Sequence, residues 1–436
     1  MRNRRKNSLT PSIWIATTLA IFVLFTASAT ADSFSSHDEI VSTDPAEFTP
    51  AVLDGMVLAV APIDDDLVVV GGDFTQVRDA SGIVRNLPYI FAFRRSTGLI
   101  ESTFNPVLNN VVSSLAAGTD GASVYVGGYF TDVNGQSNKK GLTKLDLAGD
   151  RITEFKGRTD ARVKDIALVN DVLYVAGTFS KYISFPADVL IAADATTGQP
   201  LSTVDFDFAG EFSTTRTNGT LSVDEIDVTS DGSTLVAIGN FGTIDGQTRN
   251  RLAVFDLSGP TATLSPWMTT IYSFQCGTLK PQYVSDIDIS PDDSYFVVAS
   301  SGGYGGGNLA CDTAHRFNFA DVGGDVQPAW TNYSGGDTYL GLAISGEVVY
   351  VGGHFRWLNN PFEAGQQAEG AVPRRGFAAL DPLNGLPLTW RADRSPRGIG
   401  TYEVLADDSG IWIGDDTDNI SSVSYTHLTL PTIYSV

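Results

Sequence analysis

Two kinds of hydrophobic pattern follow one another along the chain. Residues 223–228 (VDEIDV) alternate between apolar and polar side chains, which predicts a strand with one buried face. After a Ser-Asp-Gly-Ser turn at 230–233, residues 235–239 (LVAIG) carry no polar side chain, which predicts a second strand buried on both faces. An Asp-Gly pair between two such stretches is typical of a β-hairpin.

Two more strands complete the unit. Residues 251–256 (RLAVFD) predict a third strand, and an outer strand ends at Trp267. No stretch of the unit has the 3.6-residue period of an amphipathic helix. Four antiparallel strands in about fifty residues, without a helix, predict one blade of a β-propeller.

The unit repeats along the chain. Its second strand returns with the ending Gly-Gly-x-Phe or an altered form of it, and Phe74, Phe130, Phe179 and Phe241 lie 49 to 62 residues apart. Such a period is typical of solenoids, propellers and repeat arrays. The copies lie at residues 68–74, 124–130, 173–179, 235–241, 295–300, 349–355 and 411–414.

The start of the repeat region predicts how the blades close. Residues 48–53 (FTPAVL) resemble residues 104–108 (FNPVL), which end the outer strand of the first full unit, yet no inner strands precede them. We therefore expect the N-terminal strand to complete the last blade, which removes open sheet edges. The prediction is an all-β, seven-bladed β-propeller of four-stranded antiparallel blades at 45–422, whose incomplete last blade is closed by the N-terminal strand. An eighth blade is the alternative left open.

Both ends of the chain differ from the repeat. Four basic residues, an apolar run at 13–25 and small residues up to Ala31 predict a secretory signal peptide at 1–31, followed by an N-terminal tail at 32–44. A membrane anchor is the alternative, but the run is shorter than the roughly 20 residues that span a bilayer. We expect an extracellular or cell-surface protein. Residues 423–436 match no part of the repeat and resemble a translated sequencing adapter, so we interpret them as a non-native read-through tail.

The charge balance narrows the range of partners. The chain has 50 acidic and 28 basic residues, a net charge of −22 and a sequence pI near 4.4. Nucleic acids and anionic membranes require cationic surfaces, so neither is expected as a partner. We also expect no membrane insertion once the signal peptide is removed.

Two cysteines occur, Cys276 and Cys311. In an exported protein such a pair is usually a disulfide, which we predict here. Two free buried thiols are the alternative. A redox or metal site is not expected, because there is no C-x-x-C motif.

The repeat resembles a known family. The Gly-Gly-x-Phe strand, the loops at 134–136 (NGQ) and 245–247 (DGQ), and the D-x-x-T-G turn after the third strand are similar to the delta-sixty type of secreted bacterial β-propeller repeat, over about residues 45–420. That family has no assigned activity. The resemblance implies a module of a longer cell-surface protein, with adhesive or carbohydrate-binding domains downstream. The fifth repeat departs from the pattern, because residues 300–307 (SSGGYGGG) replace Gly-Gly-x-Phe.

Acidic clusters are candidate calcium sites, because closely spaced carboxylates provide hard oxygen ligands. The clusters at 64–66, 292–293 and 407–408 fall in predicted hairpin turns, where Asp is favoured for backbone reasons. Asp415, Asp416 and Asp418 instead follow a second strand, and we take them as the calcium candidate. No other cofactor is predicted.

Basic residues recur just before the third strand. If equivalent positions fall on one face of a ring of blades, these residues form a cationic collar that holds an anionic glycan or a carboxylate. The alternative is that they pair with acidic residues of neighbouring blades. The residues are Arg85, Lys139, Lys140, Arg249, Arg251, Arg374 and Arg375.

The chain contains no G-x-S-x-G, H-E-x-x-H or P-loop motif, so no catalytic residues are predicted. We expect a non-catalytic interaction scaffold whose partner is an extracellular glycan or protein. The alternatives are a carbohydrate-active enzyme that uses carboxylates of a central channel, and a structural spacer in a longer surface protein.

Overall fold

The structure, a computed structural model, describes residues 40–43, 45–46, 49–213, 219–274, 276, 283–302, 310–361, 365–417, 419–420, 423–424 and 432–433. The predicted signal peptide, Phe48 and Asp418 lie outside these residues. The strands pair antiparallel, in sheets of two to four strands, which confirms the all-β prediction. The described residues form no α-helix, and hence none with the length and apolar character of a membrane span.

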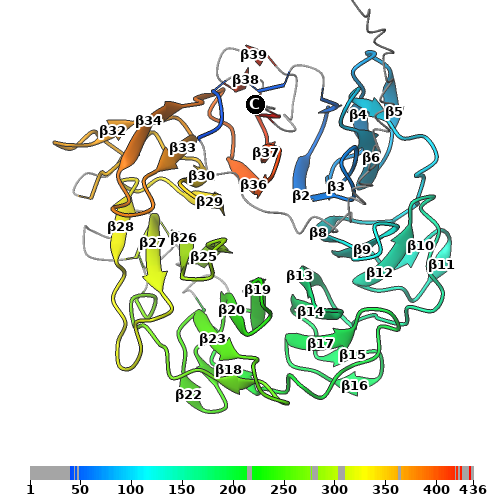
Figure 1. Cartoon of the computed structure of the whole chain (residues 1–436), viewed down its shortest axis with the longest axis horizontal. Coiled ribbons are helices and arrows are strands. Elements are labelled where there is room, and N and C mark those ends of the chain that lie inside the picture. The colour runs from blue at the N-terminus through cyan, green and yellow to red at the C-terminus, as the bar shows by residue number, and fades with distance from the viewer. Residues whose placement is uncertain are drawn as a thin grey trace, which may run out of the picture. The chain divides into compact units, whose positions relative to one another are not determined.

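Seven sheets share one strand order, and we number them 1 to 7 along the chain (Figure 1). A first strand pairs with a second, the second with a third and, in sheets 1, 4, 5 and 6, the third with a fourth. Sheets 1 to 4 are β2 (Met56–Pro62), β3 (Leu67–Asp73), β6 (Ile90–Arg94) and β7 (Leu99–Ile100); β8 (Val112–Ala117), β9 (Ser123–Gly128) and β12 (Leu142–Asp146); β13 (Val163–Val169), β14 (Val172–Gly177) and β17 (Leu190–Asp194); and β19 (Ser222–Val228), β20 (Thr234–Asn240), β23 (Leu252–Asp256) and β24 (Thr263–Leu264).

Sheets 5 to 7 follow the same plan. They are β25 (Tyr283–Ile289), β26 (Tyr295–Ser301), β27 (Thr313–Asn318) and β28 (Trp330–Tyr333); β29 (Tyr339–Ile344), β30 (Val349–Gly353), β33 (Phe377–Leu380) and β34 (Pro387–Arg391); and β36 (Thr401–Asp407), β37 (Gly410–Asp415) and β40 (Thr432–Ile433). In sheets 2 and 3 the predicted fourth strand shrinks to single bridges, Leu145 with Arg151 and Ala193 with Pro200. The third strand of sheet 7 comes from the segment interpreted as read-through.

A small hairpin follows the second strand in six of the repeats, where the sequence indicated only a loop. Its tip in repeat 2 is Asn134-Gly135, with φ of 50° and 71°, and in repeat 4 Asp245-Gly246, with the same values. Two consecutive positive φ angles are typical of the type I′ turn that joins two-residue hairpins. The hairpins and their added strands are β1 (Ala51–Val52), β4 (Gln76–Arg78) and β5 (Val84–Asn86); β10 (Asp132–Val133) and β11 (Gln136–Ser137); β15 (Lys181–Tyr182) and β16 (Phe185–Pro186); β18 (Phe208–Ala209), β21 (Thr243–Ile244) and β22 (Gln247–Thr248); β31 (Trp357–Leu358) and β32 (Val372–Pro373); and, in the last repeat, β35 (Arg394–Ser395), β38 (Asn419–Ile420) and β39 (Val423–Ser424).

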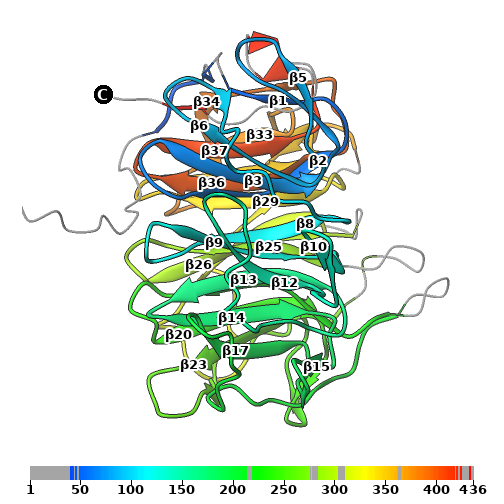
Figure 2. The same ribbon diagram turned by 90° about the vertical axis from the view of Figure 1, so that its right-hand side faces the viewer.

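The first strands of successive sheets contact one another. β2 contacts β8, and the contacts continue through β13, β19, β25 and β29 to β36 (Figure 1). β36 and β37 in turn contact β2, so the last sheet packs against the first (Figure 2). Trp412 of β37 lies in one hydrophobic cluster with Val57, Val70 and Phe93 of sheet 1.

Every first strand carries a β-bulge at the same place. In β13, for example, Val163 pairs with Gly177 and Asp165 with Ala176, so Lys164 is skipped. A bulge leaves one residue unpaired and increases the local twist of the strand. The skipped residues are Leu58, Ser113, Lys164, Asp224, Ser285, Leu340 and Tyr402.

The second glycine of Gly-Gly-x-Phe is required by a close backbone contact. A Cβ on Gly128 would lie 2.3 Å from the carbonyl oxygen of Val111. The N–H of Gly128 donates to the carbonyl of Gly141 at 2.9 Å, and the N–H of Gly141 donates to that of Phe130 at 3.1 Å. The same approach, at 2.1 to 2.3 Å, recurs at Gly72, Gly177, Gly239 and Gly353.

We expect Gly128→Ala to lower the free energy of unfolding by about 1–3 kcal/mol, because the added methyl group overpacks against a backbone that cannot move aside. Gly259→Ala is the control, since Gly259 is exposed and a Cβ there would meet nothing closer than 3.3 Å. Urea denaturation of both variants checks this. Equal stability of the two variants would contradict it.

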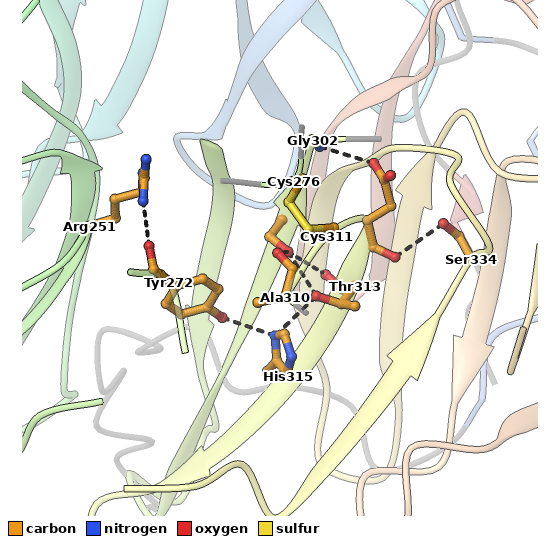
Figure 3. The surroundings of a disulfide bond; sticks show 11 residues. Arg251, Tyr272, Cys276, Gly302, Ala310, Cys311, Thr313, His315 and Ser334 are labelled. Carbon is orange, nitrogen blue, oxygen red and sulfur yellow. Dashed lines mark hydrogen bonds between the residues drawn. A yellow bond between two sulfur atoms is a disulfide. The ribbon is translucent and has the colours of Figure 1, made fainter. Parts of the chain in front are cut away.

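The predicted disulfide between Cys276 and Cys311 is present, with a Cα–Cα distance of 5.7 Å, and the free-thiol alternative is wrong (Figure 3). It lies in the repeat that lacks Gly-Gly-x-Phe. There Ser300 takes the place of the second glycine, and Gly302 donates its N–H to the carboxylate of Asp312 at 3.2 Å. In this repeat a disulfide and polar contacts thus replace the phenylalanine that packs in other repeats.

The described residues between 40 and 55, which precede sheet 1, test the prediction that the N-terminal strand completes the last blade. Val52 pairs with Val77 as Leu108 bridges Val133, so the similarity between 48–53 and 104–108 reflects an equivalent place in the fold. The N–H of Val41 donates to the Tyr350 hydroxyl at 2.9 Å, and its carbonyl accepts the indole N–H of Trp390 at 2.6 Å. Val41 also shares a hydrophobic cluster with Ile411 and Ile413 of β37. The N-terminal segment therefore packs between sheets 6 and 7. Among the described residues, however, it adds no strand to sheet 7, which consists of β36, β37 and β40, and β1 pairs instead with β4 of the first repeat.

Candidate functional site

A pocket of about 700 Å³ opens where the second strands of sheets 2 to 4 end and the first strands of sheets 3 to 5 begin. Aromatic and cationic side chains share its wall. The guanidinium carbon of Arg162 lies 4.5 Å from the ring centre of Tyr129, and that of Arg251 lies 3.4 Å from the ring centre of Phe212. Such stacking keeps a cation beside an apolar face.

Two carboxylates in the pocket wall already have partners. Lys164 Nζ lies 2.5 Å from Asp224 Oδ1. Asp160 accepts the backbone N–H groups of Ser180 and Lys181, both at 2.9 Å. The remaining charged side chains of the wall, Lys140, Arg162 and Arg251, are cationic, so the pocket is locally positive on an acidic protein.

Arg251 is almost fully buried, at 1% exposure. It occupies a position of positive φ that recurs before the third strand, at Tyr89, Gly141, Val189, Arg251, Asp312 and Gly376. Its Nη1 donates to the carbonyl of Tyr272, whereas its buried Nη2 has no hydrogen-bond partner among the described residues (Figure 3). Burial lowers the pKa of Arg251 to about 10, so the side chain is still charged at neutral pH.

The segment around Tyr272, whose carbonyl binds Arg251, is held in place by two further contacts. The Tyr272 hydroxyl lies 3.1 Å from Nδ1 of His315, and Cys276, four residues on, is bonded to Cys311 (Figure 3). Burial lowers the pKa of His315 to about 3, which keeps the ring neutral. The disulfide thus secures one wall of the Arg251 site.

The predicted collar residues do not share one environment in the structure. Lys140 and Arg251 line the large pocket, and Arg375 lines a smaller one of about 260 Å³ together with Arg356, Arg394 and Arg397. Arg85 forms a 3.6 Å ion pair with Asp79 of its own repeat. Lys139 is half-buried and lines neither pocket.

Arg249 and Arg374 have a structural role. Both are buried three residues before the third strand begins, and each donates to a backbone carbonyl at the outer edge of its own sheet: Arg249 to Ser265 at 2.7 Å and Arg374 to Leu388. Alternate residues of an extended segment point to opposite sides. For this reason Lys140 and Arg375 are exposed while Arg249 and Arg374 are buried.

The calcium candidate is occupied by a guanidinium. The side chain of Arg394 is fully buried and pairs with Asp415 and, at 2.7 Å, with Asp416. Asp416 also accepts the N–H groups of Ile399 at 2.5 Å and Gly400 at 3.1 Å. Asp418 lies outside the described residues, among which no three acidic, histidine or cysteine side chains converge as a metal site. The predicted turn role holds for Asp64, Asp292 and Asp407, which accept backbone N–H groups of their own turns.

A set of inward-placed polar residues was not predicted. In several first strands the side chain of the residue after the bulge reaches the first strand of the next sheet: Ser114 accepts the N–H of Ile166 at 3.1 Å, and Asp165 accepts that of Ile226 at 2.9 Å. Asp286 accepts the N–H of Leu342 in the same way. At the seam between sheets 7 and 1, Glu403 accepts the N–H of Val60.

A second layer lies two residues further along the first strands. Asp227 accepts the N–H of Ile289 at 2.7 Å, and Asp288 accepts that of Ile344 at 2.5 Å. Asp165, Glu225, Asp227, Asp286, Asp288 and Glu403 are called the channel carboxylates below.

The channel carboxylates hold protons tightly. Burial raises the pKa of Asp165 to about 6, of Asp227 to about 7 and of Asp286 to about 8. Burial, and then the charges of Asp286 and Asp165, raise the pKa of Glu225 and of Glu403 well above the ordinary value.

Stability is therefore expected to fall as the pH rises from about 5 to about 8. An unfolded Asp ionises near pH 3.9, so within this range the folded chain binds more protons than the unfolded one. Melting temperatures measured across the range check this, and Asp286→Asn is expected to flatten the slope. The exposed Asp65→Asn is the control and should leave the slope unchanged. A melting temperature that rises with pH in the unmodified protein would refute the expectation.

Comparison of the chain with known proteins identifies no family. No protein-family model matches the chain, and no curated protein matches it. The resemblance to delta-sixty repeats rests on the quoted residues and stays a prediction.

The channel carboxylates have a sequence signal. An acidic residue precedes the central isoleucine of the first strand in 163–168 (VKDIAL), 223–228 (VDEIDV) and 284–289 (VSDIDI). Period-two alternation indicates that these side chains do not point to the apolar face, but it does not show whether they face solvent or bond to the next sheet. The pocket wall left no such signal, because its residues come from four repeats.

Proposed function

We propose that sheets 1 to 7 are the blades of a closed seven-bladed β-propeller, and that the protein is an exported scaffold that binds an extracellular ligand without changing it. The cyclic contacts of the seven bulged first strands support the closure, as does the hydrogen bond from Val60 to Glu403. The predicted signal peptide at 1–31 supports the extracellular location.

The 700 Å³ pocket carries the proposal for ligand binding. Ligand sites are concave and combine apolar walls with a few polar groups that fix orientation. Tyr129, Phe212 and Tyr283 offer aromatic surface there, next to the hydroxyl-bearing residues Thr178 and Thr220. This combination suits a saccharide, whose rings present both apolar faces and hydroxyl groups. A protein segment that offers the same groups is the other ligand class.

Glycoside hydrolysis by the channel carboxylates is the second candidate, because strongly shifted pKa values are common at catalytic sites. Glu225 and Asp286 are hydrogen-bonded to each other, however. That places them closer than the roughly 5 Å or more that separates the two carboxyl groups of glycosidases. Asp165 and Asp286 are also engaged with backbone N–H groups of the next sheet. These contacts favour a structural role, and we propose binding without catalysis.

A glycan array probed with the full chain, read beside the release of reducing sugar from the same glycans, tests the proposal. We expect binding without release, and weaker binding by Tyr129→Ala. Release of sugar that Glu225→Gln abolishes would establish the hydrolase instead. Absence of binding to every glycan would refute saccharide binding.

A further inference from the structure

We propose that the 700 Å³ pocket recognises an acidic saccharide through the carboxylate of a uronic-acid type sugar, and that Arg251, Arg162 and Lys140 provide its cationic contacts. This inference rests on the proposed function, since it names the ligand class of the same pocket.

The first argument is the unsatisfied donor of Arg251. A guanidinium has five N–H donors, and a buried donor without a partner costs free energy. Nη1 of Arg251 is bonded to Tyr272, and the guanidinium plane stacks on Phe212. Nη2 is buried and, within the part of the chain that the structure describes, has no partner, while the side chain lines the pocket. A carboxylate oxygen is the acceptor that a guanidinium prefers.

The second argument is the surplus of positive charge at the pocket. Lys164 is paired with Asp224, and Asp160 keeps its charge while it accepts backbone N–H groups. The wall therefore holds four cationic and two anionic side chains. Lys140 and Arg162 are exposed, and among the described residues neither forms a salt bridge. Lys140 and Arg162 line the same pocket as the buried guanidinium of Arg251. These cations favour the binding of an anion in the pocket, although the whole chain carries a net charge of −22.

The third argument concerns the shape of the ligand. A small inorganic anion would leave most of a 700 Å³ pocket empty. Tyr283 is 43% exposed and, like Tyr129, contributes an aromatic surface to the wall. Sugar rings that carry a carboxylate can stack on the aromatic side chains and pair with the cations. This combination points to a uronic-acid oligosaccharide.

Isothermal titration with a galacturonic-acid trisaccharide tests the inference, with the methyl-esterified trisaccharide as the neutral counterpart. We expect the acid to bind and the ester to bind at least about tenfold more weakly, because the ester removes the charge and keeps the rings. Arg162→Gln and Lys140→Gln are expected to weaken binding of the acid several-fold. Lys156→Gln removes an exposed charge outside the pocket wall and should not change it.

Arg251→Gln is expected to abolish binding, but its loss also frees the Tyr272 carbonyl, so its melting temperature must be compared with that of the unmodified chain. The two exposed variants keep the test decisive if Arg251→Gln does not fold. Equal binding of acid and ester would overturn the inference and leave saccharide binding intact. Binding of a heparin-derived tetrasaccharide but not of the galacturonic trisaccharide would overturn the carboxylate assignment in favour of sulfate. No binding of any of these sugars, together with a blank glycan array, would remove both proposals.

Discussion

Arg394→Met is expected to lower the free energy of unfolding by about 3–5 kcal/mol, because it leaves a buried carboxylate without its cation. The side chains of Arg394 and Asp415 are both fully buried, and Arg394 also donates to the carbonyl of Gly353 at 2.7 Å. Methionine fills most of the space of the arginine stem but provides no charge. Urea unfolding followed by circular dichroism measures the loss.

Arg391→Met provides the matched control. Arg391 is paired with Asp393, but its side chain is 50% exposed, so the same substitution should cost less than about 1 kcal/mol. Adding Asp415→Asn to Arg394→Met should restore part of the lost stability, because it removes the unpaired charge. Similar losses for Arg394→Met and Arg391→Met would show that the buried pair has no special role.

Trp412→Ala should lower the free energy of unfolding by about 3–5 kcal/mol. Trp412 belongs to sheet 7 but packs edge-on against Phe93 of sheet 1, with ring centres 6.2 Å apart, and its indole N–H donates to Asp407 at 2.6 Å. Its removal opens a cavity at the contact between the first and the last sheet and leaves a buried carboxylate with one partner fewer.

Trp357→Ala is the comparison for that variant, since Trp357 lies on the small hairpin β31–β32 and is only half-buried. Its loss should cost clearly less in the same thermal and urea unfolding experiments. If Trp357→Ala destabilised the chain as much as Trp412→Ala, the contact between sheets 7 and 1 would not be important for stability.

The strands could be predicted because their patterns are local. The alternation at 223–228 and the apolar run at 235–239 match β19 and β20 to within one residue at each end. The sequence placed Gly128 at the end of a second strand but did not show why a glycine is needed there. The carbonyl that a Cβ would meet belongs to Val111, directly before the first strand of the same sheet.

The site was harder to predict because residues at equivalent positions of different repeats lie in different environments. Arg249 and Arg251 were predicted as members of one collar, yet Arg249 holds an outer strand while Arg251 faces the pocket. These two residues are two positions apart, so the alternation of an extended segment alone would place them on the same side. The positive φ of Arg251, 65°, changes the direction of the chain there, and the sequence does not reveal it. The acidic residues of the first strands were visible in the sequence, but their hydrogen bonds to backbone N–H groups of the next sheet depend on contacts between sheets.

Hydrogen exchange at the Val60 amide tests the closure most directly. Val60 lies in the first sheet and donates its N–H to Glu403 in the last one. We predict that this amide is protected in the unmodified protein and loses protection in Glu403→Ala, while the Ile226 amide, which is bonded to Asp165, stays protected in that variant. A Val60 amide that exchanges equally fast with and without Glu403 would contradict the account, because sheets 1 and 7 would then not be joined.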